Sequence, residues 1–198
     1  MIDEAIVAIK AGRLAIVPTD TVYGLATTAY RDEPVRRLLC AKGRGDGKPI
    51  ALVAADLDLL FECVPELRGR SGTIARALLP GPYTLVLPNP ARRYRWLTGS
   101  RPETIGVRVP RLEGPGREVL ERAGAYAATS ANLPGESDPA TLDDVPAVLQ
   151  AAAQAAVDAG PLPGTPSTVI DFTGPEPLVL RAGAASAAEA LHLVASVV

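Results

Sequence analysis

Short apolar runs that stop at polar clusters are the feature of this sequence that most constrains its fold. Leu14 to Val17 is typical of a buried strand, because it is short, apolar and half β-branched, and a proline follows it. Polar clusters follow such runs at Thr19 to Tyr23, Lys42 to Lys48, Arg108, Thr129 to Asn132, Ser167-Thr168 and Arg181. Loops at strand ends gather into clefts in sheet-based folds, so these clusters are candidates for one shared site.

Helix and strand patterns alternate along the chain and predict a layered α/β protein around one twisted sheet. The expected strands are Leu14 to Val17, Val22 to Ala29, Ile50 to Val53, Tyr83 to Leu87, Ile105 to Val109, Tyr126 to Ala128, Thr168 to Phe172 and Leu178 to Leu180. The expected helices are Asp3 to Ala11, a segment opening at Asp32, Leu57 to Phe61, a segment capped by Ser71, Gly114 to Ala123, a segment opened by a Thr141–Asp144 capping box, Ala147 to Ala159 on alanine propensity, and a last helix from Ser186. With no repeat or linker between them, residues 1–198 are expected to form a single domain.

Composition and charge place the chain among ordinary globular proteins. A net charge of −2 argues against a general nucleic-acid coat. Cys40 and Cys63 lack the spacing of a zinc site and, with no export signal, suit a reducing compartment. The early acidic residues of MIDEAIVAIKAG are the wrong charge order for a signal peptide, and no apolar run is long enough to cross a bilayer. We therefore expect a soluble, cytoplasmic protein.

Hydroxyl-rich and cation-rich segments lie near each other in the sequence. Thr19 to Tyr23 presents three hydroxyls and one carboxylate, and Lys42, Arg44 and Lys48 follow among glycines. Small hydroxyls bind an uncharged polar substrate or a carboxylate, and cations on a glycine-rich loop hold phosphate. The alternative interpretation is a strand end with an ST-type turn, followed by a solvated basic loop.

Other polar residues also allow two interpretations. Arg108, inside GVRVP, either faces solvent or enters a pocket to pair with an anion. The segment Thr129 to Asn132 places two hydroxyls and an amide directly after a buried strand, where a simple capping turn is the alternative. The arginines near Trp96 offer phosphate forks and stacking planes, or are simply solvated; they are Arg92, Arg93, Arg95 and Arg101.

Nucleophilic catalysis is poorly supported by the sequence. The only histidine, His192, falls in the expected last helix, where a surface or packing role is favoured. There is no GxSxG motif, and GRGDGKP lacks the hydroxyl residue of a Walker A loop. Threonine, serine, arginine and lysine without histidine or cysteine fit chemistry done by positioning and charge neutralisation, as in nucleotidyl transfer.

The order of these clusters resembles the YrdC-like threonylcarbamoyl-AMP synthase family. The matching segments lie in register from Ile16 to Ala184 and are PTDTVYGL, KGRGDGKPIALV, PGPYTLVLP, GVRVP, TSANLPG, PSTVIDF and LRAGA. The resemblance implies a short, single-domain α/β fold with a twisted, mixed, largely antiparallel sheet flanked by helices, and a strand near Ala155 to Asp158. It also implies a nucleotidyltransferase that makes threonylcarbamoyl-AMP and pyrophosphate from L-threonine, bicarbonate or CO₂, and ATP, for downstream proteins that modify tRNA.

Site residues follow from the resemblance position by position. Thr21, Arg108 and Ser167 would contact L-threonine, with Arg108 gripping the carboxylate bidentately. The residues that would contact ATP are Arg44, Lys48, Ser130 and Arg181. A second tier comprises Lys42, Thr84, Thr129, Asn132 and Asp138. Mg²⁺ would be held by phosphate and water and not by protein side chains.

Some positions differ from the usual family pattern. A serine is common where this chain has Asp138, and a carboxylate beside phosphate repels it unless a cation intervenes. Gly45 stands where proline is usual, and Val53 where some members have histidine. The alternative function is a YrdC-like fold that binds tRNA or double-stranded RNA with little or altered catalysis, using the arginines around Trp96.

Overall fold

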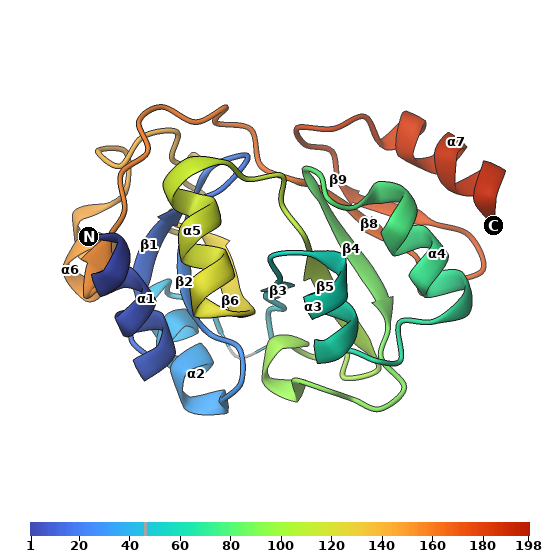
Figure 1. Ribbon diagram of the computed structural model, residues 1–198, viewed down its shortest axis with the longest axis horizontal. Coiled ribbons are helices and arrows are strands. Elements are labelled where there is room, and N and C mark those ends of the chain that lie inside the picture. The colour runs from blue at the N-terminus through green and yellow to red at the C-terminus, as the bar shows by residue number, and fades with distance from the viewer. Residues whose placement is uncertain (46) are drawn as a thin grey trace.

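The structure, a computed structural model that describes residues 1–45 and 47–198, is built on one mixed sheet (Figure 1). Its strands are β1 (Ala15–Pro18), β2 (Tyr23–Thr28), β3 (Ala51–Val53), β4 (Tyr83–Pro88), β5 (Thr104–Arg108), β6 (Tyr126–Ser130), β7 (Ala155–Ala156), β8 (Thr168–Asp171) and β9 (Leu178–Arg181). Among the described residues these nine strands are ordered β7-β1-β2-β6-β3-β5-β4-β8-β9. The described pairs β1–β7, β3–β5 and β4–β8 are parallel, and the other five are antiparallel. The expected α/β class with a largely antiparallel sheet is confirmed.

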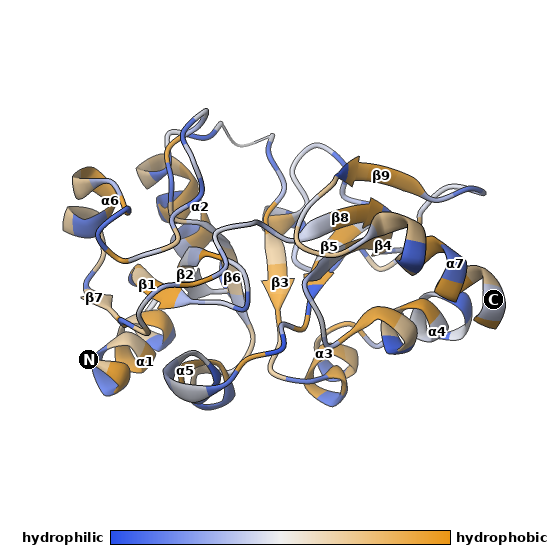
Figure 2. Cartoon of the chain, turned by 90° about the horizontal axis from the view of Figure 1, so that it is seen from above, coloured by the Kyte–Doolittle hydropathy of each residue, from blue (hydrophilic) through white to orange (hydrophobic). Residues whose placement is uncertain are grey.

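Helices cover both faces of the sheet. They are α1 (Ile2–Ala11), α2 (Asp32–Ala41), α3 (Leu57–Cys63), α4 (Gly69–Leu78), α5 (Gly114–Ala123), α6 (Ala147–Ala152) and α7 (Ala187–Val197), with a short 3₁₀ turn η1 (Arg95–Leu97). In Figure 2, α1 and α5 lie below the left-hand strands and α2 above them, whereas α3 and α4 lie below the right-hand strands. Because the strands twist relative to one another, α2 on the left and α3 and α4 on the right cover the same face of the sheet. No helix in the described ranges is both long and apolar enough to span a bilayer.

Side-chain alternation along the strands divides the core into two apolar clusters. Leu25, Leu52 and Leu85 point to the face covered by α2, α3, α4 and α7. Val17 and Val53 point to the other face and pack with residues of α1 and α5. Within the described residues, this second cluster includes none from β4, β5 or β8. One half of one sheet face therefore lacks the helical cover that the rest of the sheet has.

Most of the expected elements are confirmed, with ends shifted by one or two residues. The start of α4 is different. The helix begins at Gly69 with Arg68 as its N-cap, so Ser71 lies inside the helix and does not cap it. Gly69 adopts φ of +53°, a geometry that glycine tolerates, and the chain has already turned into the helix before Ser71.

The expected helix start at Thr141 is wrong. Thr141 N does donate to Asp144 Oδ2 at 2.7 Å, as in a capping box, but the segment forms only a turn. Pro146 follows, and proline disfavours helical geometry in the residue before it. The helix α6 therefore begins only at Ala147.

The expected single helix over Ala147 to Ala159 is also wrong. The helix ends at Ala152, and Gln154 N then donates to Leu14 O at 2.8 Å beside β1. Pairing with the edge of β1 satisfies the backbone, and this tertiary interaction outweighs the helix propensity of alanine. The strand that the family resemblance implies near Ala155 to Asp158 is confirmed as β7.

Candidate active site

A cavity of about 300 Å³ lies on the uncovered half of the sheet. Small residues form part of its lining and leave the space open; they are Gly24, Ala51, Gly106 and Ala128. Predicted site residues line it as well: Arg44, Thr84, Arg108, Thr129, Ser130, Ser167 and Arg181. A second cavity of about 660 Å³ lies between α4, α7 and the start of β4, and its described lining includes none of the predicted residues. Chemistry and not size identifies the first cavity as the candidate site.

The turn between β1 and β2 orders its hydroxyls through its own hydrogen bonds. Thr19 Oγ1 donates to Val22 O at 2.7 Å and accepts from the backbone N–H groups of Thr21 and Val22. Thr19 Oγ1 and Thr21 Oγ1 are 3.0 Å apart. Because the hydrogen of Thr19 is committed to Val22, the Thr21 hydroxyl donates to Thr19 and presents its lone pairs elsewhere. The ST-type turn considered from the sequence does form, and it orients Thr21.

Arg108 faces the cavity and not solvent. It stands at the end of β5 with its side chain only 11% exposed. Its Nη2 donates to Thr21 Oγ1 at 2.7 Å and forms an ion pair with Asp20 Oδ1. Asp20 Oδ2 in turn accepts from the backbone N–H of Arg111 at 2.9 Å. The predicted pair Thr21 and Arg108 is therefore brought together, with Thr21 buried beneath the arginine.

Asp20 is the residue of this group that the predicted site lacks. It is 9% exposed and lies between two threonines that the sequence already marks as functional. The sequence does contain a signal for pairing Asp20 with Arg108. Asp20 is a carboxylate in a hydroxyl-rich turn two residues after a buried strand, and Arg108 is a cation in an otherwise apolar strand. Neither residue is interpretable alone, because the pairing depends on how β1 and β5 are placed.

Ser167 connects the two ends of the cavity. Ser167 Oγ lies 2.8 Å from Thr84 Oγ1 on the neighbouring strand β4. Arg181, the last residue of β9, donates from Nη2 to Ser167 Oγ at 3.1 Å and to Ser167 O at 2.8 Å. Ser167, predicted to support threonine, is thus hydrogen bonded to Arg181, predicted to bind ATP.

Lys42 is fully buried behind Ser130 and Asn132. Its Nζ donates to Asn132 Oδ1 at 2.7 Å, to Ser130 Oγ at 3.2 Å and to Ser130 O. Ser130 Oγ also donates to Asn132 Oδ1 at 2.7 Å. Burial, and then repulsion by Arg44 and Arg181, lowers the pKa of Lys42 to about 7, although the charge of Asp138 opposes the shift.

Arg44 and Arg181 line the cavity near Lys42, and Asp138 lies close enough to influence the pKa values of all three. Burial lowers the pKa of Arg44 and of Arg181, and the Asp138 carboxylate counteracts both shifts. Asp138 is therefore a counter-charge to three cations, which is the condition under which a carboxylate tolerates phosphate nearby. Together these groups form a positively charged end that suits phosphate.

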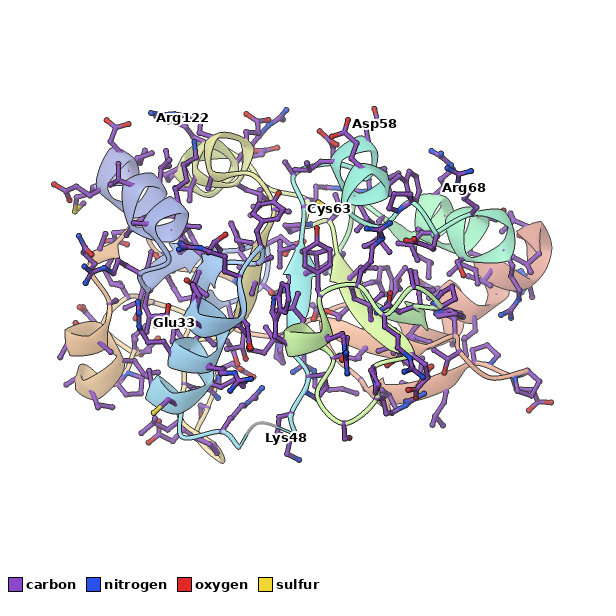
Figure 3. All side chains as sticks on the ribbon, turned by 90° about the horizontal axis from the view of Figure 1, so that it is seen from below. Glu33, Lys48, Asp58, Cys63, Arg68 and Arg122 are labelled. Atoms are coloured by element: carbon purple, nitrogen blue, oxygen red, sulfur yellow. The ribbon has the colours of Figure 1, made fainter. Side chains whose placement is uncertain are left out.

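Lys48 and Thr129 occupy less central places. Lys48 is exposed and does not line the cavity; Figure 3 shows it at the outer edge of the molecule, on the loop that leads into β3. Thr129 lines the cavity from β6. Residue 46, within the predicted Lys42 to Lys48 cluster, lies outside the described residues.

The arginines near Trp96 do not form an open stacking platform. Trp96 Nε1 donates to Ala29 O at 2.8 Å and its half-buried ring packs edge-on against Tyr94. Arg93 is bound to Glu66 at 2.7 Å, and Arg101 to Asp171 at 2.8 Å. The sequence allowed these two arginines to be either solvated or bound to phosphate, and in the structure both form ion pairs with carboxylates.

Groups typical of metal or histidine chemistry are not concentrated at the cavity. His192 is exposed on α7, as its position in the sequence predicts. In the part of the chain that the structure describes, no set of three or more histidine, cysteine, aspartate or glutamate residues is placed to hold a metal ion. Arginines, a lysine and hydroxyls are the groups that the site offers.

Comparison with known proteins gives consistent results. A family model described as Sua5/YciO/YrdC, telomere recombination, matches residues 7–183. The threonylcarbamoyl-AMP synthase of Pyrococcus abyssi is 34% identical over 88% of this chain and 52% of its own length.

Two solved structures share the fold. P. abyssi Sua5 in complex with L-threonine superposes with a TM-score of 0.88 at 32% identity, covering 99% of this chain and 58% of that protein. Escherichia coli YciO gives a TM-score of 0.81 at 27% identity, covering 96% and 92%. The chain spans little more than half of the P. abyssi protein and nearly all of YciO. With the family match extending over most of its length, the chain belongs to the Sua5/YciO/YrdC family.

Proposed function

We propose that this protein is an L-threonylcarbamoyladenylate synthase, a nucleotidyltransferase that forms threonylcarbamoyl-AMP and pyrophosphate from L-threonine, bicarbonate or CO₂, and ATP. The observation that carries the proposal is one cavity with two differently built ends. Arg108 with its hydroxyls lies at one end, Arg44 and Arg181 line the other, and Lys42 lies buried behind Ser130 at that end. A zwitterionic amino acid and a triphosphate are the ligands that these ends fit.

The amino acid end suits threonine. Arg108 would bind the carboxylate, and the hydroxyls of Thr84 and Ser167 offer partners for the remaining polar groups. The complex of the P. abyssi relative with L-threonine supports this assignment.

The nucleotide end suits a triphosphate. Arg44 and Arg181 are partly desolvated cations, so a phosphate oxygen gains more from them than it would from exposed arginines. Ser130 and Asn132 hold the Lys42 ammonium through three neutral acceptors, and its charge is uncompensated by these partners. These residues would bind and orient the phosphates.

The reaction requires positioning more than side-chain chemistry. The threonine ammonium first loses a proton to solvent. The amine nitrogen then bonds to the carbon of CO₂ and releases a second proton; with bicarbonate, that proton leaves with a hydroxide as water. An oxygen of the resulting carbamate attacks the α-phosphorus, and the bond to pyrophosphate breaks. Arg44, Arg181 and Lys42 would stabilise the charge that develops on the phosphates in this step.

Mg²⁺ fits this site as a companion of ATP. The nucleotide end presents three cations and one carboxylate, Asp138, a set that favours phosphate over a bare metal ion. The ion would be held by phosphate oxygens and water, and it would offset the charge of the leaving pyrophosphate.

The product would pass to proteins that transfer the threonylcarbamoyl group to tRNA. ATP and tRNA occur together in the cytoplasm, which is the compartment we propose. Direct contact with tRNA or double-stranded RNA would add to this function, and the ion-paired arginines near Trp96 do not favour it as a function of its own.

Pyrophosphate release tests the proposal. The protein is incubated with ATP, Mg²⁺ and bicarbonate, with threonine, with serine or without amino acid. We expect release that requires both threonine and bicarbonate, and strong loss of release in Arg181→Gln. Arg93→Gln is the matched control, because Arg93 lies outside the cavity lining and pairs with Glu66. No release, or release independent of amino acid, contradicts the proposal.

A further inference from the structure

The donors of Arg108 limit how a carboxylate can bind to it. A guanidinium has two edges that accept a carboxylate bidentately, Nε with Nη2 and Nη1 with Nη2, and both include Nη2. Nη2 has two hydrogens, and in this structure one is directed to Asp20 and the other to Thr21. Arg108 Nε is buried without a partner among the described residues. A bidentate carboxylate therefore has to displace one of the two acceptors at Nη2.

The two acceptors differ in how firmly they are held. Asp20 is charged and 9% exposed, and its second oxygen accepts from the backbone of Arg111 at 2.9 Å. Removing it from Arg108 would leave a buried carboxylate without its counter-ion. The Thr21 hydroxyl is neutral, and a neutral acceptor gives a weaker bond to a guanidinium than a carboxylate does.

The Thr21 hydroxyl can also change its hydrogen-bond partner. It donates to Thr19 Oγ1, which is 3.0 Å away and already receives two backbone N–H groups. If a substrate carboxylate takes its place at Nη2, the freed hydroxyl can rotate and donate to that carboxylate. The exchange then replaces two hydrogen bonds, Arg108 Nη2 to Thr21 and Thr21 to Thr19, by three to the carboxylate, two from Arg108 and one from the Thr21 hydroxyl.

We propose that Asp20 is the positioning residue that fixes Arg108 in the cavity, and that the threonine carboxylate exchanges with the Thr21 hydroxyl at Nη2 while Asp20 stays in place. The inference rests on the proposed function, because it takes threonine as the ligand. It assigns Asp20 a role through Arg108 and places no contact between Asp20 and the substrate.

Asp20→Asn tests the positioning role, since it retains the shape and removes the charge. We expect the KM for threonine to rise about ten- to hundred-fold, the loss typical of a charge-assisted hydrogen bond, with the KM for ATP within about twofold. Asp144→Asn is the control, because Asp144 also accepts backbone N–H groups, from Ala140 and Thr141, and none of these three residues lines the cavity. It should leave the KM for threonine unchanged. An unchanged KM in Asp20→Asn, or an equal rise in both variants, overturns the positioning role.

Two NMR signals of the unmodified protein test the exchange without relying on a variant that folds. Addition of threonine should shift the Nε–H resonance of Arg108, identified by its loss in Arg108→Lys, and leave the Asp20 Cγ resonance in place. A large shift of Asp20 Cγ means that the substrate displaces Asp20 and overturns the proposal.

The same titration separates this inference from the proposed function. If threonine shifts the Arg108 signal and leaves Asp20 Cγ in place but no pyrophosphate is released, the synthase assignment fails and the exchange at Arg108 stands. If threonine leaves both signals unchanged at saturating concentration, the exchange is refuted.

Discussion

Arg181 donates two hydrogen bonds to the carbonyl oxygen of Ser167, from Nε at 3.0 Å and from Nη2 at 2.8 Å. Ser167 directly precedes β8, Arg181 ends the paired strand β9, and each lines the cavity. Since one faces the proposed nucleotide and the other the proposed amino acid, the two ligands are expected to affect each other's binding through this contact.

Thr84→Val is expected to weaken threonine binding through Ser167. Arg181 is always a donor, so it fixes Ser167 Oγ as an acceptor, and Thr84 Oγ1 is the remaining partner that orients the serine hydroxyl. Loss of one neutral hydrogen bond, worth about 1 kcal/mol, should raise the KM for threonine about fivefold. Thr84→Ser retains the hydroxyl and should behave like the parent protein. Equal KM values in all three proteins would show that the pair is only structural.

Arg108→Ala is expected to abolish threonine-dependent turnover and also to destabilise the protein. Without the arginine, Asp20 remains as a buried, unpaired carboxylate, and breaking such a pair lowers the free energy of unfolding by about 3 kcal/mol. The double variant Asp20→Asn with Arg108→Ala should recover part of that stability and none of the activity. Urea unfolding of the four proteins measures the coupling. Additive losses would contradict a stabilising ion pair.

The pKa of Lys42 predicts how ATP binding depends on pH. Burial depresses this pKa to about 7, with Arg44 and Arg181 adding repulsion and Asp138 opposing it, so the ammonium loses its proton as the pH rises through 7. The Lys42 ammonium has its three hydrogens on Ser130 and Asn132, so it acts on phosphate through its charge, and ATP affinity should fall as that charge is lost between about pH 7 and 9. Calorimetry at three pH values measures this, and Lys42→Met should show a flatter profile.

The same shift has the opposite sign for folding. The pKa of Lys42 is lower in the folded than in the unfolded chain, so the unfolded chain binds more protons between pH 7 and about 10. Above about pH 10 Lys42 therefore does not destabilise the folded protein. As the pH falls toward 7, its destabilising effect grows. The parent protein should gain stability relative to Lys42→Met as the pH rises over this window.

Gly106→Val should separate stability from function. A Cβ built on Gly106 meets its nearest atoms, in Ala51 and Thr84, at 3.8 and 4.0 Å, so the fold has room for a side chain. Replacing a glycine within a strand should stabilise the protein by about 0.5 kcal/mol. The valine would nevertheless occupy the cavity that Gly106 lines, and pyrophosphate release should fall sharply. Gly106→Ala is the smaller control, and a fully active valine variant would place the ligands elsewhere.

Sequence reasoning succeeded where local pattern and tertiary structure agree. The hydroxyl-rich turn and Arg108 each allowed a site or a simpler interpretation, the family resemblance favoured a site, and the structure places Arg108 beside that turn. It failed for Ala147 to Ala159, because the open edge of β1, which is distant in sequence, decided the conformation of that segment. Asp20 was missed for the same reason, since its importance depends on a partner 88 residues away. Lys48, which the resemblance predicts to contact ATP, lies outside the cavity lining.

The sheet order has a consequence for the timing of protein synthesis. The cavity is lined by residues from Thr19 to Arg181, and Arg181 belongs to β9, which occupies the edge of the sheet beside β8. A chain still growing on the ribosome lacks this strand until nearly all of the sheet has been made. If nucleotide binds there as proposed, it cannot stabilise a half-synthesised chain, and a molecule gains stability from its substrates only after β9 has left the exit tunnel.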